Sequence, residues 1–236
     1  MPLLDYRSFR HVVVLTGAGL SVGSGLPTYR GKDGLWKDGE IHPLASADGI
    51  RSDLMGCWDF FLPLRAGALQ ASPNAGHLAL VEFEASLPLE TEFTLITQNV
   101  DGLHRRAGTL NLVELHGNIT RSRCNNEACS AEPIEDQRDY AGLCTVCGGR
   151  LRPDIVLFGE MLPVEATWGM KKALRKVDLF IAIGTSGTVL PAAMMVDYAQ
   201  SNGAVTVEFN LESSGNFRHF VPGPSEETLP RELAGS

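Results

Sequence analysis

The sequence is short of positive charge and of long apolar runs, and each shortage excludes a class of function. Its 20 lysines and arginines are outnumbered by 28 aspartates and glutamates, which gives a formal net charge of -8. Nucleic-acid binding needs a basic surface, so this balance argues against it. No apolar run approaches the roughly 20 residues that a bilayer span needs, and residues 1–10 lack the apolar core of a secretory signal. We therefore expect a cytoplasmic protein that binds neither nucleic acid nor membranes.

Cysteine is also scarce, yet four of the five cysteines fall into two close pairs. Cys124 and Cys129 have four residues between them, Cys144 and Cys147 form a CxxC, and 14 residues separate the pairs. This spacing is typical of a tetrahedral zinc site in which each tight turn supplies two thiolates. The alternatives are two disulfides, which the lack of a secretory signal disfavours, or four unrelated core cysteines. We predict one structural zinc per chain, closed to water because all four ligands are thiolates.

Short apolar runs rich in β-branched residues alternate with helical stretches along the chain. The predicted strands are residues 12–15, 93–97, 112–115, 154–158, 179–183 and 205–209. The predicted helices run from Pro73, capped by Ser72, to about Leu87, and over 168–176 and 191–200. This alternation predicts an α/β fold, a doubly wound parallel sheet with helices on both faces. The strands bracket the cysteines, so the zinc-binding part is predicted to be an insertion.

Unusual residues gather where the predicted strands end, which is the edge at which such sheets bind ligands. Gly17-Ala18-Gly19 follows the first strand, Gly184-Thr185-Ser186 follows a later one, and Asn210 follows the last. Glycines let the backbone approach a pyrophosphate closely, although an ordinary tight turn would explain a single Gly-x-Gly. The acidic residue usually found about 20 positions further on has no clear counterpart. The pattern therefore predicts a variant dinucleotide site.

Several longer segments resemble, in order, the signature blocks of the sirtuins, which are NAD-dependent protein-lysine deacylases. The blocks are Gly17-Ala18-Gly19-Leu20-Ser21, the run from Ser24 to Arg30, Thr97-Gln98-Asn99-Val100-Asp101-Gly102-Leu103-His104, Leu115-His116-Gly117, Phe158-Gly159-Glu160, Gly184-Thr185-Ser186 and Val207-Glu208-Phe209-Asn210. The four cysteines also match. The resemblance covers the chain from about His11 to Pro230.

The resemblance implies a role for each matching residue. His116 is expected to act as general base toward a ribose hydroxyl, for which the pKa of imidazole is suited. Catalysis is also expected to need Asn99 and Asp101, which would hold the nicotinamide and ribose end of NAD. The remaining NAD-binding residues are expected to be Gly17, Ala18, Ser21, Tyr29, Arg30, Gln98, Gly184, Thr185, Ser186, Asn210 and Ser225. The substrate peptide is expected to pair as an added strand with Val156, Phe158 and Gly159.

One departure from the family bears on the acyl group. The helix start Asn74-Ala75-Gly76-His77 and the run Thr28-Tyr29-Arg30-Gly31 resemble the branch that removes succinyl and malonyl groups. That branch reads the acyl carboxylate with a tyrosine and, three residues later, an arginine. Phe61 and Leu64 stand at those two positions. Arg65 is next, but one residue along a helix turns a side chain by about 100°. We predict an apolar acyl pocket. A second departure, Tyr29 for the usual phenylalanine, keeps the aromatic ring.

The sequence thus predicts a Rossmann-like NAD-binding domain with an inserted small domain. Residues 1–28, 89–120 and 151–236 are assigned to the former, and residues 29–88 and 121–150 to a small helical and zinc-binding domain. The predicted function is NAD-dependent removal of acetyl or longer neutral acyl groups from protein lysine, which yields O-acyl-ADP-ribose, nicotinamide and free lysine. The alternatives are an NAD glycohydrolase or ADP-ribosyltransferase, and a non-catalytic NAD sensor or scaffold. Retention of His116, Asn99 and Asp101 disfavours the non-catalytic alternative.

Overall fold

The computed structural model describes residues 2–28, 41–185 and 192–234. Three residues to which the sequence assigned NAD binding, Tyr29, Arg30 and Ser186, lie outside these ranges. No helix in the described part is both long and apolar enough to cross a bilayer.

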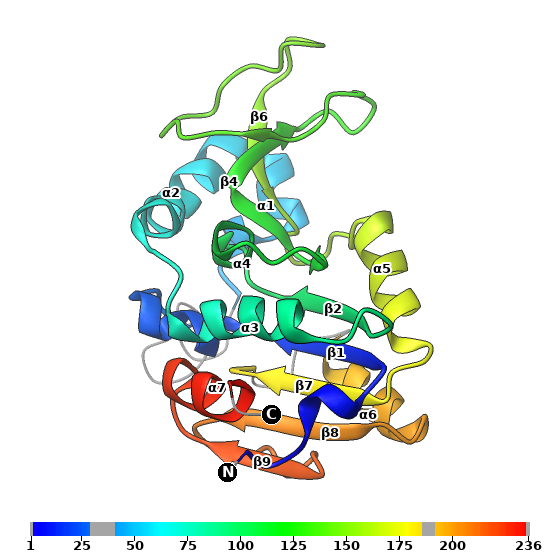
Figure 1. Ribbon diagram of the computed structural model, residues 1–236. Helices are drawn as coiled ribbons and strands as arrows, with labels where there is room; N and C mark the ends of the chain where they lie inside the picture. The colour runs from blue at the N-terminus through cyan, green and yellow to red at the C-terminus, as the bar shows by residue number, and fades with distance from the viewer. Residues whose placement is uncertain (1, 29–40, 186–191, 235–236) are drawn as a thin grey trace.

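The larger part of the molecule is built on a six-stranded sheet whose neighbouring strands are all parallel. The strand order is β3-β2-β1-β7-β8-β9, and Figure 1 shows β2, β1, β7, β8 and β9 stacked in this order in the lower part of the view. Their bounds are β1 His11–Thr16, β2 Glu92–Thr97, β3 Leu112–Glu114, β7 Leu179–Ile183, β8 Val205–Asn210 and β9 His219–Pro222. From β1 the order runs outward to β3 on one side and to β9 on the other. The direction of winding therefore reverses between β1 and β7.

Alternate residues of the strands enter two separate apolar cores, because successive side chains of a strand point to opposite faces. Val12 and Val14 pack with α3 (Ala75–Ser86) and α7 (Ser225–Leu233). Val13 and Leu15 pack on the other face with α5 (Val164–Leu174) and α6 (Ala192–Ser201). All five residues of β7 are buried. Burial on both faces explains why these strands read as continuous apolar runs.

A smaller antiparallel sheet and two helices form the rest of the described molecule. The sheet order is β5-β4-β6, with β4 Gly117–Cys124, β5 Ile134–Glu135 and β6 Leu151–Ile155. The helices are α1 Ala47–Ser52 and α2 Leu54–Gln70, and Figure 1 shows them next to β4 and β6 at the top of the molecule. The described residues also include the short helix α4 (Leu103–Ala107) and 3-10 segments at Tyr6–Ser8, Ala18–Ser24 and Pro43–Ala45.

The sequence predicted the architecture but not every element: α1, α2, α4, α7, β4 and β5 were not predicted, and three further details differ. Residues 154–158 were predicted as a strand of the parallel sheet, but the strand here is β6, and it pairs antiparallel with β4. The sixth strand of the parallel sheet is β9, which was not predicted. Helix α3 is capped by Asn74 and not by Ser72: the Asn74 side chain accepts from the backbone of Gly76 and His77, and His77 Nδ1 accepts from the Asn74 N–H.

The predicted division into two domains stays a prediction. Strands β4 and β6 pair with each other across the boundaries drawn at residues 120 and 151. Cys124 is the last residue of β4 and the other three clustered cysteines lie between β4 and β6, so the zinc-binding part is an insertion between β3 and β7.

Candidate active site and metal centre

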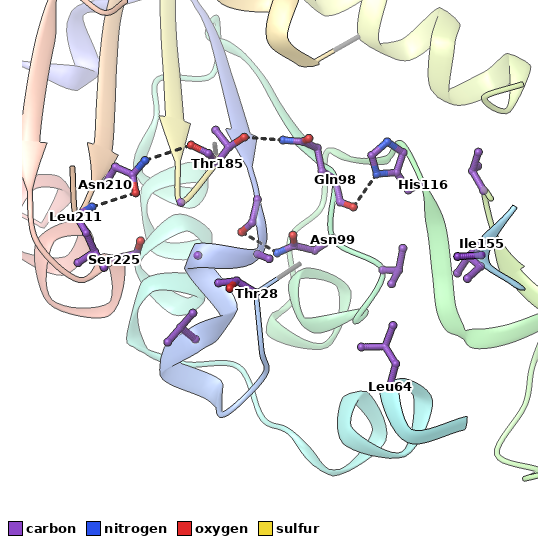
Figure 2. Close-up of a pocket in the computed structure, with 18 of the residues that line it drawn as sticks. Thr28, Leu64, Gln98, Asn99, His116, Ile155, Thr185, Asn210, Leu211 and Ser225 are labelled. Carbon is purple, nitrogen blue, oxygen red and sulfur yellow. Dashed lines mark hydrogen bonds between the residues drawn. The ribbon is translucent and has the colours of Figure 1, made fainter. Parts of the chain in front are cut away.

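A cavity of about 1140 Å³ lies along the carboxyl edge of the parallel sheet and extends to α2 and to the segment after β6. In open α/β sheets, ligands bind at this edge, at the point where the winding reverses. The cavity meets that rule, since the turns after β1 and β7 both line it. Figure 2 shows residues from these turns and from α2 around one space.

Glycines at these two turns serve close packing. The N–H of Gly17 donates to the carbonyl of Ile183, and the N–H of Gly19 donates to that of Gly184, both at 2.9 Å. A β-carbon on Gly19 would lie 2.6 Å from the Cα of Gly184, and Gly184 has a φ of +56°. A side chain at either position would push the turns apart. The amides of Gly17 and Gly19 are therefore already bonded within the protein.

A row of hydrogen bonds crosses the sheet edge from β8 to the residues after β3 (Figure 2). Asn210 Nδ2 donates to the carbonyl of Thr185 (3.1 Å), and Gln98 Nε2 donates to Thr185 Oγ1 (3.0 Å). The Gln98 carbonyl lies 2.9 Å from Nδ1 of His116. Four predicted site residues are thus held in one connected line.

The contact with Gln98 fixes the tautomer of His116. A carbonyl can only accept, so Nδ1 carries the hydrogen and Nε2 holds the lone pair in the neutral ring. Burial lowers the pKa of His116, and the hydrogen bond to Gln98 opposes that shift. The ring is therefore neutral at physiological pH. This is the form that a general base requires.

Behind the cavity wall lies a buried polar cluster of Asn99, Asp101 and Ser21. Asn99 Nδ2 donates to the carbonyl of Gly17 (3.0 Å) and to Ser21 Oγ (3.2 Å). Ser21 Oγ donates to Asp101 Oδ2 at 2.7 Å. Asn99 lines the cavity, whereas Ser21 and Asp101 are not among its lining residues. Burial raises the pKa of Asp101, opposed by hydrogen bonds from Leu103 and Ser21.

Two buried histidines support this cluster from the side away from the cavity. Thr16 Oγ1 donates to Thr97 Oγ1 (2.8 Å), and Thr97 Oγ1 also accepts from the N–H of Asn99. His104 Nε2 lies 2.9 Å from Thr16 Oγ1 and must be the donor, because the hydroxyl has given its only proton to Thr97. His77 packs on His104 with ring centroids 4.9 Å apart. Both rings are buried, as a structural role for them requires.

The other end of the cavity is apolar. Phe61 and Leu64 of α2 line this end together with Val100, Ile155 and Leu157. That this end binds an acyl group stays a prediction. Arg65 does not line this end: the side chain is buried and its guanidinium donates to main-chain carbonyls of Ile119, Arg121 and Asp136.

Val156, Phe158 and Gly159 also line the cavity. The N–H of Val156 donates to the carbonyl of His116 (2.9 Å). The main chain of Phe158 bonds to Ala45 and Ala47 through both its N–H and its carbonyl. Pairing of a peptide with this segment stays a prediction, and the two bonds of Phe158 are already made within the protein.

Reasoning from the sequence missed the segment beyond Asn210. Leu211, Glu212, Ser213 and Ser214 line the cavity together with the predicted Ser225. The backbone N–H of Ser214 donates to the buried carboxylate of Glu208 at 2.9 Å, so β8 anchors this loop. In the sequence, the only feature that indicated a role for these residues is their position directly after Asn210, a predicted site residue.

The sulfur atoms of the four paired cysteines lie close enough together to bind one zinc ion. Their sulfur atoms all lie within 4.8 Å of one another, with Cys124–Cys147 at 3.5 Å and Cys129–Cys144 at 3.7 Å. Zinc–sulfur bonds of about 2.3 Å in a tetrahedron place sulfurs about 3.8 Å apart. The backbone N–H groups of Asn126 and Gly149 point at the sulfurs of Cys124 and Cys147. The residues present therefore fit a zinc ion with four thiolate ligands.

Comparison with known proteins identifies the family. Residues 17–191 match the model of the Sir2 family. This chain belongs to the Sir2 family. The resemblance to sirtuins predicted from the sequence is thereby confirmed.

Individual Sir2 relatives match most of the chain. An NAD-dependent protein deacylase of Aquifex aeolicus is 42% identical, covering 86% of this chain and 84% of that protein. The mitochondrial NAD-dependent protein deacylase sirtuin-5 of Canis lupus familiaris is 37% identical, covering 98% and 85%. Among solved structures, a Sir2 homologue in complex with NAD has a TM-score of 0.83 at 33% identity, covering 94% of this chain and 88% of that one. A Sir2 protein with a deacetylated p53 peptide and 3′-O-acetyl ADP-ribose has a TM-score of 0.82 at 31% identity, covering 95% and 93%.

Proposed function

We propose that this Sir2-family chain is an NAD-dependent protein-lysine deacylase that removes acetyl or longer neutral acyl groups. The observation that carries the proposal is a single cavity in which the turns after β1 and β7, the neutral His116 and the apolar residues of α2 all meet. The curated relatives named NAD-dependent protein deacylases support it. Acyl-lysine, NAD and one water molecule would be consumed, and the products would be nicotinamide, free lysine and O-acyl-ADP-ribose.

Different parts of the cavity would serve different parts of the reaction. NAD, when bound, supplies an anomeric carbon from which nicotinamide departs as the acyl carbonyl oxygen attacks. His116 would then take a proton from a ribose hydroxyl at Nε2, while Gln98 keeps Nδ1 protonated and the ring oriented. Asn99, fixed by Gly17 and Ser21, would hold the nicotinamide end, with Asp101 positioned behind it. The dinucleotide would lie along Gly17, Ala18, Gly184, Thr185, Asn210 and Ser225.

The apolar end of the cavity would select the acyl group. Phe61 and Leu64 offer neither a phenol nor a cation to an acyl carboxylate. Arg65 is held by three carbonyls and cannot take their place. An unpaired carboxylate buried here would cost several kcal/mol, roughly, while each buried methylene contributes about 0.8 kcal/mol. We therefore propose acetyl and longer aliphatic chains as substrates, ahead of succinyl.

The metal centre would have a structural role. Cys124, Cys129, Cys144 and Cys147 leave no ligand position for water, so a zinc ion there would hold the fold rather than react. Four cysteines remain reduced, and so able to bind zinc, in a reducing compartment, which favours the cytoplasm as the location. The division into an NAD-binding domain and a small zinc-binding domain is part of the same proposal.

The decisive experiment measures kcat/KM on one peptide carrying acetyl, octanoyl or succinyl lysine, with NAD. We expect acetyl or octanoyl to be removed at least tenfold more efficiently than succinyl, and nicotinamide release to depend on the acyl peptide. The double variant Phe61→Tyr with Leu64→Arg should raise desuccinylation and lower removal of the aliphatic groups. Efficient desuccinylation by the natural chain would contradict the acyl assignment. Nicotinamide release without acyl peptide would instead indicate a glycohydrolase.

A further inference from the structure

Strand β4 carries a bulge three residues after His116. Its ladder with β6 pairs Gly117 with Ile155 and Asn118 with Asp154, then slips and resumes at Ser122 with Pro153. Proline has no N–H to donate, and bulges are among the places where a sheet accepts it. The carbonyls within the bulge must therefore find partners outside the β4–β6 ladder.

Arg65 supplies a partner for two of those carbonyls. Its Nη1 donates to Ile119 (2.5 Å) and to Arg121 (3.2 Å), alternate residues whose carbonyls point the same way. Its Nη2 donates to the main-chain carbonyl of Asp136, which lies between the two cysteine pairs. One guanidinium thus joins α2, the bulge of β4 and the cysteine-rich segment, by which we mean residues 124–150.

The surroundings show that this arrangement is built into the core. Arg65 is only 2% exposed, and its guanidinium carbon lies 5.4 Å from the centre of the buried ring of Trp58. The carboxylate of Asp136 is 3.8 Å away and is itself held by Arg138. A planar fork that donates to several acceptors at once suits arginine and not lysine.

Both ends of this contact lead to the cavity. On the helix, Arg65 is one turn beyond Phe61 and directly follows Leu64, and both of these line the apolar end. On the strand, the N–H of Ile119 donates to the carbonyl of Val100 (2.7 Å), which stands between Asn99 and Asp101. Moving the guanidinium would therefore shift the acyl-pocket helix relative to the segment that carries the buried polar cluster.

We propose that Arg65 is a positioning residue, which sets the distance between the acyl-pocket helix α2 and the segments at residues 99–101 and 116–121 and ties both to the zinc-binding part. This inference rests on the proposed deacylase function. Arg65 itself touches no substrate. It acts through Phe61 and Leu64 on one side and through Ile119 and Val100 on the other.

The test compares Arg65→Met and Arg65→Lys with the natural chain on acetyl and octanoyl peptides, with separate KM values for peptide and NAD. Methionine keeps the length of the side chain but removes every donor, and misplacement of about 1 Å can cost on the order of 100-fold. We expect kcat/KM for the peptides to fall about 10- to 100-fold, the acetyl-to-octanoyl preference to change, and KM for NAD to stay within about twofold. Lysine should restore part of the loss. Arg51→Gln, at an exposed arginine of α1, is the matched control and should change nothing.

Zinc content and melting temperature are measured on each variant. A folded, zinc-loaded Arg65→Met protein with unchanged peptide kinetics and unchanged chain preference would overturn the proposal, as would equal losses toward peptide and NAD. If Arg65→Met does not fold, Arg65→Lys decides alone: wild-type kinetics and preference would then refute the proposal. Failure of the deacylase function itself would be seen first in the natural chain, which would then act on neither peptide.

Discussion

The parallel sheet and the cysteine-rich segment are each stabilised by a different kind of interaction. All five residues of β7 are buried, and apolar side chains cover both faces of the sheet. Between residues 125 and 150, in contrast, only Asp136, Ala141, Gly142 and Cys144 are buried. Apolar burial is spread over many contacts, so one can be lost at limited cost, whereas a site with four ligands and little core depends on each of them. The contrast predicts that removing one apolar side chain destabilises the sheet only locally. Removing one zinc ligand is expected to unfold the whole cysteine-rich segment.

Loss of the metal is the largest expected effect. Apparent binding free energies of structural zinc reach about 10–16 kcal/mol, so Cys144→Ser should unfold the segment around the cysteines and abolish activity. Zinc content by elemental analysis, together with circular dichroism, measures both. Cys57→Ser is the matched control: Cys57 is buried in α2, away from the cluster, and should retain zinc. Full activity in zinc-free protein would refute the prediction.

Substitution of His116, the proposed general base, should lower activity without destabilising either the parallel sheet or the cysteine-rich segment. His116→Ala is expected to lower kcat by about 10²–10⁴-fold with zinc content and melting temperature unchanged. Since burial lowers the pKa of His116 and only the neutral ring can accept a proton, activity should persist below about pH 6.5 and fall as the pH drops through that pKa. His11→Ala, at the opposite end of β1, is the control. A His116→Ala protein with near-normal turnover would exclude this role.

A cavity in the sheet core should be costly but local. Phe180 is fully buried in β7, and Phe180→Ala should lower the free energy of unfolding by about 3–5 kcal/mol while the protein keeps its zinc. Urea titration followed with a zinc indicator measures both quantities. Leu89→Ala, at a fully exposed leucine, should stay within about 0.5 kcal/mol. Zinc release from Phe180→Ala in the absence of denaturant would show that the two parts do not respond separately.

The smallest expected effect is a loss of stability at acid pH that comes from His77, a buried histidine of α3. Helix α3 packs on one face of the parallel sheet. Burial lowers the pKa of His77 to about 4, against about 6.5 in an unfolded chain. Between these values the unfolded chain binds a proton that the folded chain does not, so this contribution is complete above about pH 6.5 and is lost as the pH falls toward 4, by at most about 3 kcal/mol. His77→Gln keeps a side chain suited to the capping box and should flatten the pH dependence. An unchanged slope would assign the loss elsewhere, for example to protonation of the zinc ligands.

The sequence predicted most of the fold because the sheet buries both faces. Continuous apolar runs such as residues 179–183 can only be strands or buried helices, and their length and glycine endings favour strands. Strand β9 was missed because it is short, lies at the sheet edge and ends in Pro222, which contradicts a central strand. The segment at 154–158 was placed in the wrong sheet because its composition gives no information about its partner.

The motifs predicted which residues meet at the cavity, but not which of them lie behind its wall. The order of the blocks brought His116, Asn99 and Gln98 to one edge, and the structure places them in the cavity wall. That Ser21 and Asp101 lie behind Asn99 depends on hydrogen bonds between segments about 80 residues apart, which spacing does not encode. The position of Arg65 was equally hidden, since its partners are main-chain carbonyls and carry no signal in the sequence.

The strand order also imposes a sequence of events on synthesis. Strand β1 is made early, and Val12 in it pairs with Leu179 of β7. Strand β7 follows every element of the zinc-binding part in the chain, so it is made only after them. Domains made on the ribosome fold as their residues emerge, so the cysteine cluster can close while one edge of β1 is still open. During that interval the run Val12-Val13-Val14-Leu15 is an unpaired, highly apolar edge of the kind that other chains can add to. A nascent chain halted before residue 179 would hold its metal and present this edge, yet lack the wall of the cavity at Gly184 and Thr185.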